Sequence, residues 1–213
     1  MHRVLLFAKR PRPGKVKTRL TPPLSAEQAA EVYRAFLADL SRMLQSLSAN
    51  YSVEWYWDDA PTTDDARELT LDGFELHQQG AGDLGQRLRR AFGRLDRPTL
   101  VIGGDCPTVS IDDVHQAFEA LEQERSVVIK PAEDGGYLLI GSHRYASSLF
   151  TDIDWGSERV FEQTRERLIQ AGLELHLLRP SFDVDTVDDL HRLARLSSPP
   201  LPVTKETLSR LGF

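Results

Sequence analysis

The chain has a single cysteine and no long apolar segment. With Cys106 alone, no intramolecular disulfide can form. No apolar run approaches the roughly 20 residues that cross a bilayer, and the first apolar run, 4–7, is too short for the core of a secretion signal. The sequence therefore predicts a cytoplasmic protein with no membrane partner.

Three frequent catalytic patterns are also missing. The histidines, at positions 2, 77, 115, 143, 176 and 191, include no pair at zinc-ligand spacing, and no serine stands in a Gly-x-Ser-x-Gly motif. Gly14 is the one glycine in the loop that directly follows the first apolar run, where a dinucleotide-binding fingerprint requires three. These absences argue against zinc chemistry, acyl transfer and hydride transfer.

The overall charge argues against a nucleic-acid partner. The formal net charge is −6 over 213 residues, whereas proteins that coat nucleic acid usually present a basic face. Hydrophobic residues make up 40% and charged residues 27%, which is typical of a globular protein. We expect one domain over residues 1–197, followed at 198–213 by a proline-rich linker and a short helix docked on the same domain. The oligomeric state stays open.

Short apolar runs alternate with helical patterns along the chain. The runs predict strands at 4–7, 53–57, 74–78, 100–102, 127–129, 138–140 and 173–178. Between the first two, apolar residues recur every three or four positions behind a capping box of Ser25 and Gln28, which predicts a helix. Later helices are expected to start at Asp83, Ser110, Ser157 and Thr186. This alternation predicts an α/β fold with a mainly parallel sheet.

The turn at 133–136 joins two of these strands directly. So short a connection predicts an antiparallel hairpin, and therefore a mixed sheet. Ligands of such sheets bind outside the carboxyl ends of the strands, where we expect the loops at 9–19 and 104–107 and the region of Asp183 to project.

Cations crowd the loop that follows the first predicted strand. Lys15, Lys17 and Arg19 alternate along it, so in an extended loop their side chains share one side. They can offset the charge of a phosphate chain, and a guanidinium can bind phosphate through two parallel hydrogen bonds. The structural alternative is a solvated basic loop. The position directly after the first strand favours phosphate binding.

Acidic residues stand where two later strands end. Asp105 follows two glycines after the strand at 100–102, and Asp183 and Asp185 point to the same side if their segment is extended. A carboxylate at a strand end can hold Mg²⁺ or Mn²⁺ against phosphate oxygens, and we assign Asp105 and Asp183 to the metal. The alternatives are that Asp105 caps a turn before Pro107, and that Asp185 or Thr186 caps the next helix.

The hairpin turn indicates an acceptor site. Asp134 can orient a hydroxyl or act as a base, and the backbone amides of Gly135 and Gly136 can lie against a sugar or another acceptor. Trp155 can form a wall of the same site. The structural alternatives are ordinary turn chemistry for the hairpin and partly buried packing for the tryptophan.

Two further features, at Gly82 and Cys106, are weaker indications of function. Gly82 precedes a predicted helix whose first amides can meet a phosphate or a base edge, although an N-cap with permissive glycines explains it equally. Cys106 stands beside Asp105, and a neighbouring carboxylate raises the pKa of a thiol, so we assign it no chemistry.

Taken together, the motifs match a known pattern. In chain order they are the basic loop after Phe7, GDLGQR at 82–87, GGDCP at 103–107, PAEDGGY at 131–137 and FDVDT at 182–186. As a set, from Val4 to Leu193, they resemble the DUF2064 family, glycosyltransferase-like members of the nucleotide-diphospho-sugar transferase (GT-A) superfamily. The superfamily also includes molybdenum-cofactor and phospholactate guanylyltransferases. Those enzymes begin with a Leu-Ala-Gly-Gly-type loop, which Ala8–Arg12 replaces here.

The resemblance implies a fold and a set of contacts. It implies a single Rossmann-like α/β/α sandwich of GT-A type, with helices on both faces of the sheet and an acceptor over the hairpin. It also implies that the nucleotide is held by Ala8, Lys9, Gly14, Lys15, Lys17, Arg19, Gly82 and Gly104.

We therefore predict a transferase that depends on Mg²⁺ or Mn²⁺. Its partners would be a nucleoside triphosphate or nucleotide sugar and a small acceptor, with Lys17, Arg19 and Asp134 in catalytic roles. Three cations in one loop favour a triphosphate, whereas the family resemblance favours glycosyl transfer. The alternative is a non-catalytic nucleotide-binding protein that retains the fold.

Overall fold

The computed structural model describes residues 1–69, 74–93, 97–143 and 147–213. The strands in these ranges are β1 (His2–Ala8), β2 (Tyr51–Trp57), β3 (Glu75–Gln78), β4 (Thr99–Gly103), β5 (Ser126–Pro131), β6 (Tyr137–Ser142) and β7 (Glu174–Leu177). The helices are α1 (Ala26–Gln45), α2 (Thr63–Glu68), α3 (Leu84–Phe92), α4 (Ile111–Ala120), α5 (Val160–Gln170), α6 (Val187–Ala194) and α7 (Pro202–Arg210), with 3₁₀ turns η1 (Thr18–Leu20) and η2 (Ser147–Phe150).

The strands form one sheet in the order β3-β2-β1-β4-β6-β5-β7. Strand β6 is antiparallel to both of its neighbours, β4 and β5, and the other pairings are parallel. The predicted mixed, mainly parallel sheet is confirmed, as is the hairpin between β5 and β6. As a result, the carboxyl ends of the parallel strands lie at one edge of the sheet, where the start of β6 joins them.

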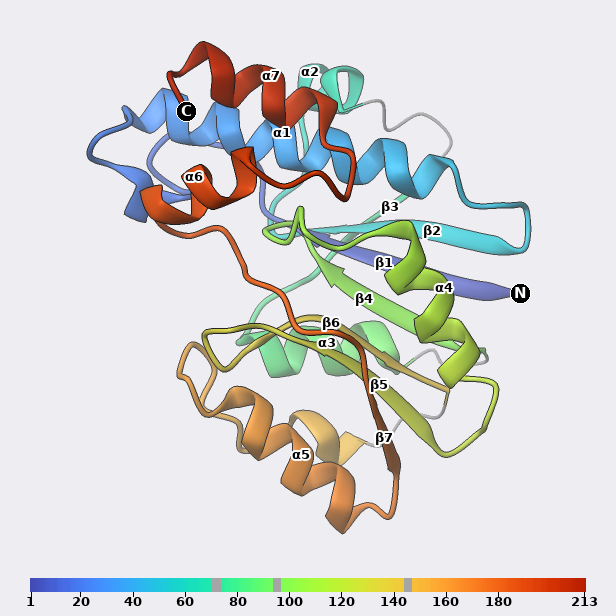
Figure 1. The fold of residues 1–213 in the computed structure, drawn as a ribbon. Helices are drawn as coiled ribbons and strands as arrows, with labels where there is room; N and C mark the ends of the chain where they lie inside the picture. The colour runs from blue at the N-terminus through green and yellow to red at the C-terminus, as the bar shows by residue number, and fades with distance from the viewer. Residues whose placement is uncertain (70–73, 94–96, 144–146) are drawn as a thin grey trace.

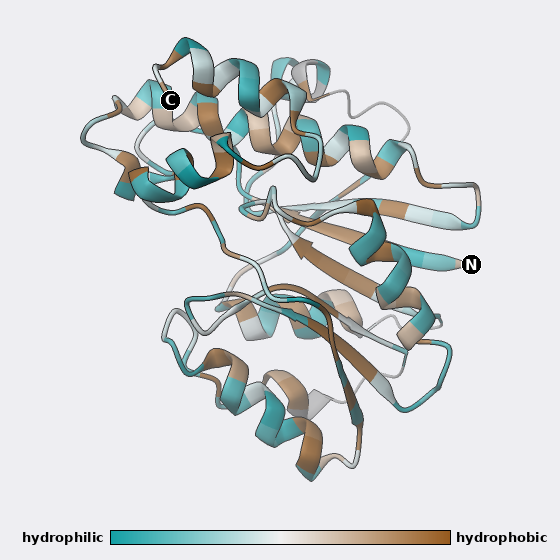
Figure 2. Cartoon of the chain, viewed as in Figure 1, coloured by the Kyte–Doolittle hydropathy of each residue, from teal (hydrophilic) through white to brown (hydrophobic). Residues whose placement is uncertain are grey.

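Helices cover both faces of this sheet (Figure 1). Side chains of β1 alternate between two cores because successive residues of a strand point to opposite faces. Val4 and Leu6 pack in the core that holds residues of α1, α4, α6 and α7, whereas Leu5 and Phe7 pack in the core with α3 and α5. Figure 2 shows the apolar residues concentrated on these central strands and the helix sides that face them. The predicted α/β/α sandwich is confirmed.

Most helices begin where the sequence predicts. Capping boxes start α1, α3, α4 and α6, at Ser25, Asp83, Ser110 and Thr186. The prediction for Ser157 was wrong: α5 begins at Val160, after an N-cap Arg159 that makes no side-chain capping bond. Ser157 Oγ instead accepts a hydrogen bond from the Arg159 backbone at 3.2 Å, which closes a turn ahead of the helix.

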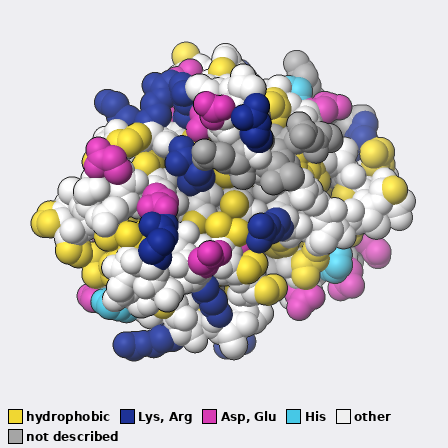
Figure 3. All heavy atoms as spheres, turned by 90° about the horizontal axis from the view of Figure 1, so that it is seen from above, with side chains coloured by type: hydrophobic (Ala, Val, Ile, Leu, Met, Phe, Trp, Pro, Cys, Tyr) yellow, Lys and Arg dark blue, Asp and Glu magenta, His cyan; other side chains and the backbone are white. Residues whose placement is uncertain are grey.

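The C-terminal helix α7 packs along α1 (Figure 1). Asp39 of α1 is buried and accepts hydrogen bonds from the backbone N–H groups of Val203 and Thr204, at 3.1 and 2.8 Å. These two N–H groups lie in the first turn of α7, where they have no partner within the helix. On the face seen in Figure 3, Lys and Arg side chains are interspersed with Asp and Glu. None of the described helices is long and apolar enough to cross a membrane.

Candidate functional site

A cavity of about 520 Å³ opens at the carboxyl ends of the parallel strands. Lys9 reaches it after β1, Gln79 after β3, Asp105 after β4 and Asp183 after β7, and the hairpin between β5 and β6 closes one side. Its lining is Phe7, Lys9, Tyr33, Gln79, Gly82, Asp83, Leu84, Arg87, Gly103, Gly104, Asp105, Cys106, Ala132, Asp134, Gly136, Tyr137, Leu138 and Asp183.

The structure brings half of the predicted site residues to this cavity. Those that line it are Lys9, Gly82, Gly104, Asp105, Asp134, Gly136 and Asp183. The predicted residues outside the lining are Ala8, Gly14, Lys15, Lys17, Arg19, Gly135 and Trp155. Carboxylates therefore form most of the charge on the cavity wall, and the basic loop stands behind it.

Asp183 is the most perturbed of these carboxylates. Burial, together with the nearby charges of Asp185 and Asp134, raises the pKa of Asp183 to about 6. The Asp105 side chain is 41% exposed and lines the same cavity. A cation bound among several carboxylates would offset their mutual repulsion and so stabilise the folded protein.

The basic loop is not extended, so the condition under which its three cations would share one side is not met. Gly14, at φ +70°, closes a turn in which the Lys15 N–H donates to the Arg12 carbonyl at 3.0 Å. The backbone then passes through the left-handed region at Lys17 (φ 46°) and enters η1. Consequently Lys15 is exposed, Lys17 is buried and Arg19 is exposed.

The Lys17 ammonium links the loop to the acids. Its Nζ lies 3.1 Å from Asp185 Oδ1 and 3.4 Å from Asp105 Oδ1, and its side chain is buried. Burial lowers the pKa of Lys17, but Asp105 and Asp185 raise it by more, so this pKa lies above its ordinary value. Arg19 pairs with the other oxygen of Asp185 at 3.1 Å. Lys17 therefore stays charged beside the metal candidate Asp105.

The two candidate acids after β7 now have different surroundings. Asp185 is held by Lys17 and Arg19, whereas Asp183 lines the cavity with a raised pKa. The helix cap next to them is Thr186, whose side chain accepts from the Asp189 backbone. This arrangement leaves Asp183 as the acid available to a ligand.

Other loop cations are paired away from the cavity. Arg10 Nε lies 3.0 Å from Asp65 Oδ2, and Arg12 pairs with Asp59. In the part of the chain that the structure describes, Lys9 and Lys15 form no ion pair. The loop is thus anchored to the segment after β2 by Arg10 and Arg12, two cations that were not among the predicted phosphate ligands.

Several predicted glycines serve packing. A Cβ on Gly104 would lie 2.9 Å from both the Tyr33 hydroxyl and Leu37 Cδ2, so the bare backbone lets helix α1 approach β4. Gly135, at φ +89°, has its α-carbon against the backbone of Glu158, which a Cβ would overlap. These contacts explain both glycines without a ligand, although Gly104 also lines the cavity.

Of the residues predicted to bind the acceptor, some line the cavity and others pack behind its wall. Asp134 Oδ1 accepts the Gly136 N–H at 2.9 Å, and both residues line the cavity. Trp155 stands behind them, with its ring edge-on to Tyr137 at 6.4 Å between centroids, and its Nε1 fills the space beside Gly85. Trp155 therefore supports the wall that Tyr137 forms.

Among the cavity residues that sequence reasoning did not assign to the site are the polar side chains of Tyr33, Gln79 and Arg87. The Tyr33 hydroxyl accepts the Lys9 N–H at 2.9 Å, and burial raises the pKa of this tyrosine well above its ordinary value. Gln79 is buried and bonded to the ends of β1 and β2. Tyr33 belongs to the apolar stripe of α1, and nothing in the local sequence distinguishes Gln79, so only the fold identifies them.

The N-terminus of α3 is occupied by its own cap. Asp83 Oδ1 accepts a hydrogen bond from the Gln86 N–H at 2.8 Å, and Gln86 Oε1 accepts one from the Asp83 N–H. A carboxylate at this end already satisfies the positive end of the helix dipole. An N-cap with permissive glycines, the alternative given for Gly82, therefore describes this segment.

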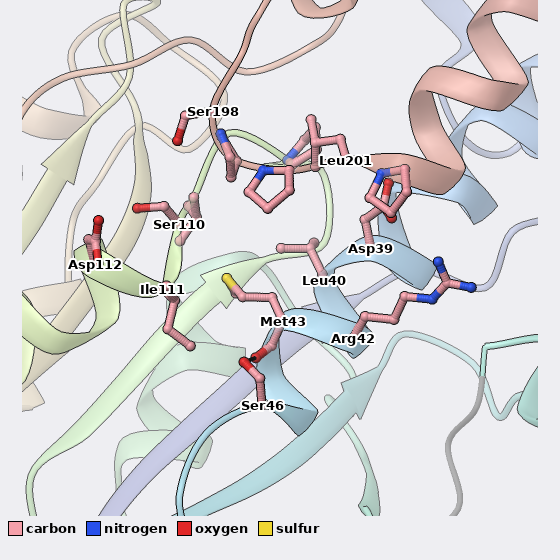
Figure 4. A pocket seen from close by; sticks show the side chains of 15 residues that line it. Asp39, Leu40, Arg42, Met43, Ser46, Ser110, Ile111, Asp112, Ser198 and Leu201 are labelled. Carbon is pink, nitrogen blue, oxygen red and sulfur yellow. Dashed lines mark hydrogen bonds between the residues drawn. The ribbon is translucent and has the colours of Figure 1, made fainter.

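A possible metal-binding cluster and a second cavity lie elsewhere in the molecule, and a polar group of each is already engaged. Ligand atoms of Glu54, Glu75 and His77 lie within 4.8 Å of one another, but Arg3 already binds both oxygens of Glu54, at 2.5 and 2.7 Å. A second cavity, of about 380 Å³, lies between α1, the start of α4 and the proline-rich segment (Figure 4). Ser110 in its wall is engaged in the cap of α4. The strand-end cavity is thus the candidate site.

Comparison with known proteins identifies a family that matches part of the chain and a related structure that covers nearly all of it. The family described as "Uncharacterized protein conserved in bacteria (DUF2064)" matches residues 41–157. A Desulfovibrio desulfuricans G20 structure, described as a "putative nucleotide-diphospho-sugar transferase", is 31% identical, with a TM-score of 0.86 over 98% of this chain and 94% of that chain. No curated protein matches the chain.

More distant structures share the fold. A nucleotidyl transferase from Methanothermobacter is 13% identical, with a TM-score of 0.61 over 99% of both chains. A cytidylyltransferase from Leptospira borgpetersenii is 16% identical, with a TM-score of 0.58 over 99% of this chain and 92% of that chain. At such identities the likeness concerns the fold alone.

Proposed function

Because the chain belongs to the DUF2064 family, we propose that it is a divalent-metal-dependent transferase that takes a nucleotide or nucleotide sugar as donor and a small molecule as acceptor. The observation that carries the proposal is the strand-end cavity, whose lining includes both Asp105 and Asp183, with Lys17 paired to Asp105. The proteins to which it is structurally similar include a "putative nucleotide-diphospho-sugar transferase", a nucleotidyl transferase and a cytidylyltransferase, which supports this chemistry.

The carboxylates of the cavity fit a hard divalent cation. Mg²⁺ and Mn²⁺ prefer oxygen ligands and are commonly bound by one or two carboxylates together with substrate phosphates. Asp105 and Asp183 would hold the ion, and the raised pKa of Asp183 reflects first its burial and then the charges of Asp185 and Asp134, which Lys17 offsets only in part. When bound, the cation would stabilise negative charge on the phosphate oxygens.

The cations behind the cavity would act on the phosphates. Lys17 and Arg19 both hold Asp185 now, and a phosphate chain would compete with this carboxylate for the same donors. Lys17 is the better placed of the two because its ammonium also touches Asp105, whereas the Arg19 side chain is 76% exposed. Their charge would stabilise the leaving pyrophosphate or nucleoside diphosphate.

The hairpin would orient the acceptor. The bond from the Gly136 N–H fixes the Asp134 carboxylate at the cavity wall, where it can accept a proton or a hydrogen bond from an attacking hydroxyl. The acceptor oxygen would then form the new bond to phosphorus or to the sugar carbon as the donor's leaving group departs. Asp134 would be the base of this step.

A binding panel tests the proposal. Nucleoside triphosphates, diphosphates and nucleotide sugars would be tested by thermal shift, each with and without Mg²⁺, on the natural protein and on Asp105→Asn. We expect a donor whose stabilisation, a few degrees, needs the metal and is lost in the variant. Ser197→Ala, a change at an exposed residue outside the cavity lining, serves as the control. The absence of any metal-dependent shift would refute the proposal.

A further inference from the structure

The proposed scheme gives no role to Arg87, a charged side chain of the cavity lining. It lies on α3 and lines the same cavity as the acidic residues that follow β4 and β7. Within the described residues it has no carboxylate partner, although most other arginines there do. Its bonds go instead to neutral oxygens: Nε donates to the Gly82 carbonyl at 2.9 Å, and Nη1 to Gln79 Oε1 at 3.0 Å.

Gln79 is built to hold that guanidinium. It is 6% exposed, and its Nε2 donates to the carbonyls of Ala8 and Tyr56, at 3.0 and 2.9 Å. Two carbonyl acceptors on one side and a guanidinium on the other fix which end of the amide is nitrogen. The side chain therefore ties the ends of β1 and β2 to the residue after β3, and leaves its oxygen for Arg87 alone.

The remaining donors of Arg87 are free for a ligand. A guanidinium has five N–H groups, of which two are used by Gly82 and Gln79. The three that remain belong to Nη1 and Nη2, in a rigid planar fork that pairs with two adjacent acceptors. Leu84, 42% exposed and lining the same wall, adds an apolar surface beside this fork. A ligand that fits this wall would have hydrogen-bond acceptors along one edge and a flat apolar face, and a nucleobase has both.

We infer that Arg87, positioned by Gln79, reads the base of the nucleotide donor, and that it selects bases with two adjacent acceptors. Guanine offers O6 and N7, and cytosine offers O2 and N3, whereas adenine places an amino donor beside N7. The inference rests on the proposed function, because it requires a nucleotide in this cavity. It assigns the donor class as a guanine or cytosine nucleotide.

Calorimetry of the four nucleoside triphosphates, with saturating Mg²⁺, tests this assignment. Arg87→Met should weaken GTP or CTP binding about 10- to 100-fold, the range expected for a bidentate arginine–base contact, and change ATP binding little. Arg89→Met is the matched control: it removes the same charge from the same helix, but Arg89 lies outside the cavity lining and bonds Thr151 Oγ1 at 3.4 Å. It should leave the ratios between bases unchanged.

Two more variants distinguish a loss of base recognition from a loss of protein stability. Arg87→Lys keeps the charge without the fork, and should lose the preference between bases while the protein still binds. Gln79→Leu should reduce the preference, and the double variant with Arg87→Met should be no less selective than Arg87→Met alone. These ratios compare ligands on one protein, so a general loss of stability does not alter them.

The outcomes distinguish the two claims. Unchanged base ratios in Arg87→Met, an equal loss for all four nucleotides, or a natural protein that prefers ATP would overturn the base-reading assignment and leave the transferase proposal standing. If no nucleotide binds the natural protein, both are refuted.

Discussion

Replacing Asp183 by asparagine should make the metal-free protein more stable at neutral pH. The carboxylate is half-buried next to Asp185 and Asp134, and these surroundings disfavour its charge. Asparagine keeps the size and removes the charge. An acid maintained at such a position is expected to lower stability, because function and not packing requires it.

The magnitude follows from the pKa. Raising a carboxyl pKa from 3.8 to about 6 corresponds to about 3 kcal/mol between the two protonation states. Because the side chain is partly exposed, solvent screening reduces the effect on stability to about 1–2 kcal/mol. For a chain of this size that is a rise in Tm of roughly 2–8 °C.

The sign depends on pH in a definite way. The folded state binds the proton of Asp183 more tightly than the unfolded state, so stability from this group is present below about pH 4 and is lost as the pH rises towards 6. The advantage of Asp183→Asn should therefore be absent at pH 4, grow up to about pH 6, and stay constant above it.

Urea unfolding of both proteins at pH 4, 5, 6 and 8, in chelator, measures this difference. Added Mg²⁺ should raise the stability of the natural protein at pH 8 and reduce the advantage of the variant. A variant that is less stable than the natural protein at pH 8, or one whose advantage does not change between pH 4 and 8, would refute the reasoning.

Three other substitutions probe the same architecture. Gly135→Ala should destabilise the protein by more than about 2 kcal/mol in urea unfolding, because its Cβ overlaps Glu158, whereas Gly156→Ala, at φ +85° in open space, should lose only about 1 kcal/mol; equal losses would contradict the packing role. Lys17→Met should weaken metal-dependent nucleotide binding about 10-fold or more by calorimetry, and an unchanged Kd would remove this ammonium from the phosphate site. Asp39→Ala should lower the free energy of unfolding by about 1–3 kcal/mol through the uncapped start of α7, and a urea midpoint equal to the natural protein's would disprove that cap.

The sequence was sufficient for the sheet and for most helix starts because their signals are local. A run such as 4–7 marks a buried strand by itself, and a capping box needs only residues three apart, as at Ser25 and Gln28. Helix α2 escaped notice although Thr62 and Asp65 form a capping box at its start, because its six residues are too few to display a helical period. At Ser157 the capping residue type was present, but its hydroxyl closes a turn ahead of the helix.

The site was only partly predictable because its geometry depends on contacts distant in sequence. The alternation of cations after β1 does not reveal that a left-handed backbone at Lys17 buries this side chain against Asp185, 168 residues away. Likewise, Gln79 gains its importance from carbonyl groups of β1 and β2. Strand ends could be assigned to one edge from the pattern, whereas the pairing of side chains across that edge required the fold.

The central claim is that a divalent cation and a nucleotide meet between Asp105 and Asp183. Its most direct test is anomalous diffraction from crystals grown with Mn²⁺ and the tightest-binding nucleotide. We predict an anomalous peak at about 2.2 Å from carboxylate oxygens of both residues and from a phosphate oxygen. Mn²⁺ bound instead at Glu54, Glu75 and His77, or a nucleotide outside the strand-end cavity, would contradict the account.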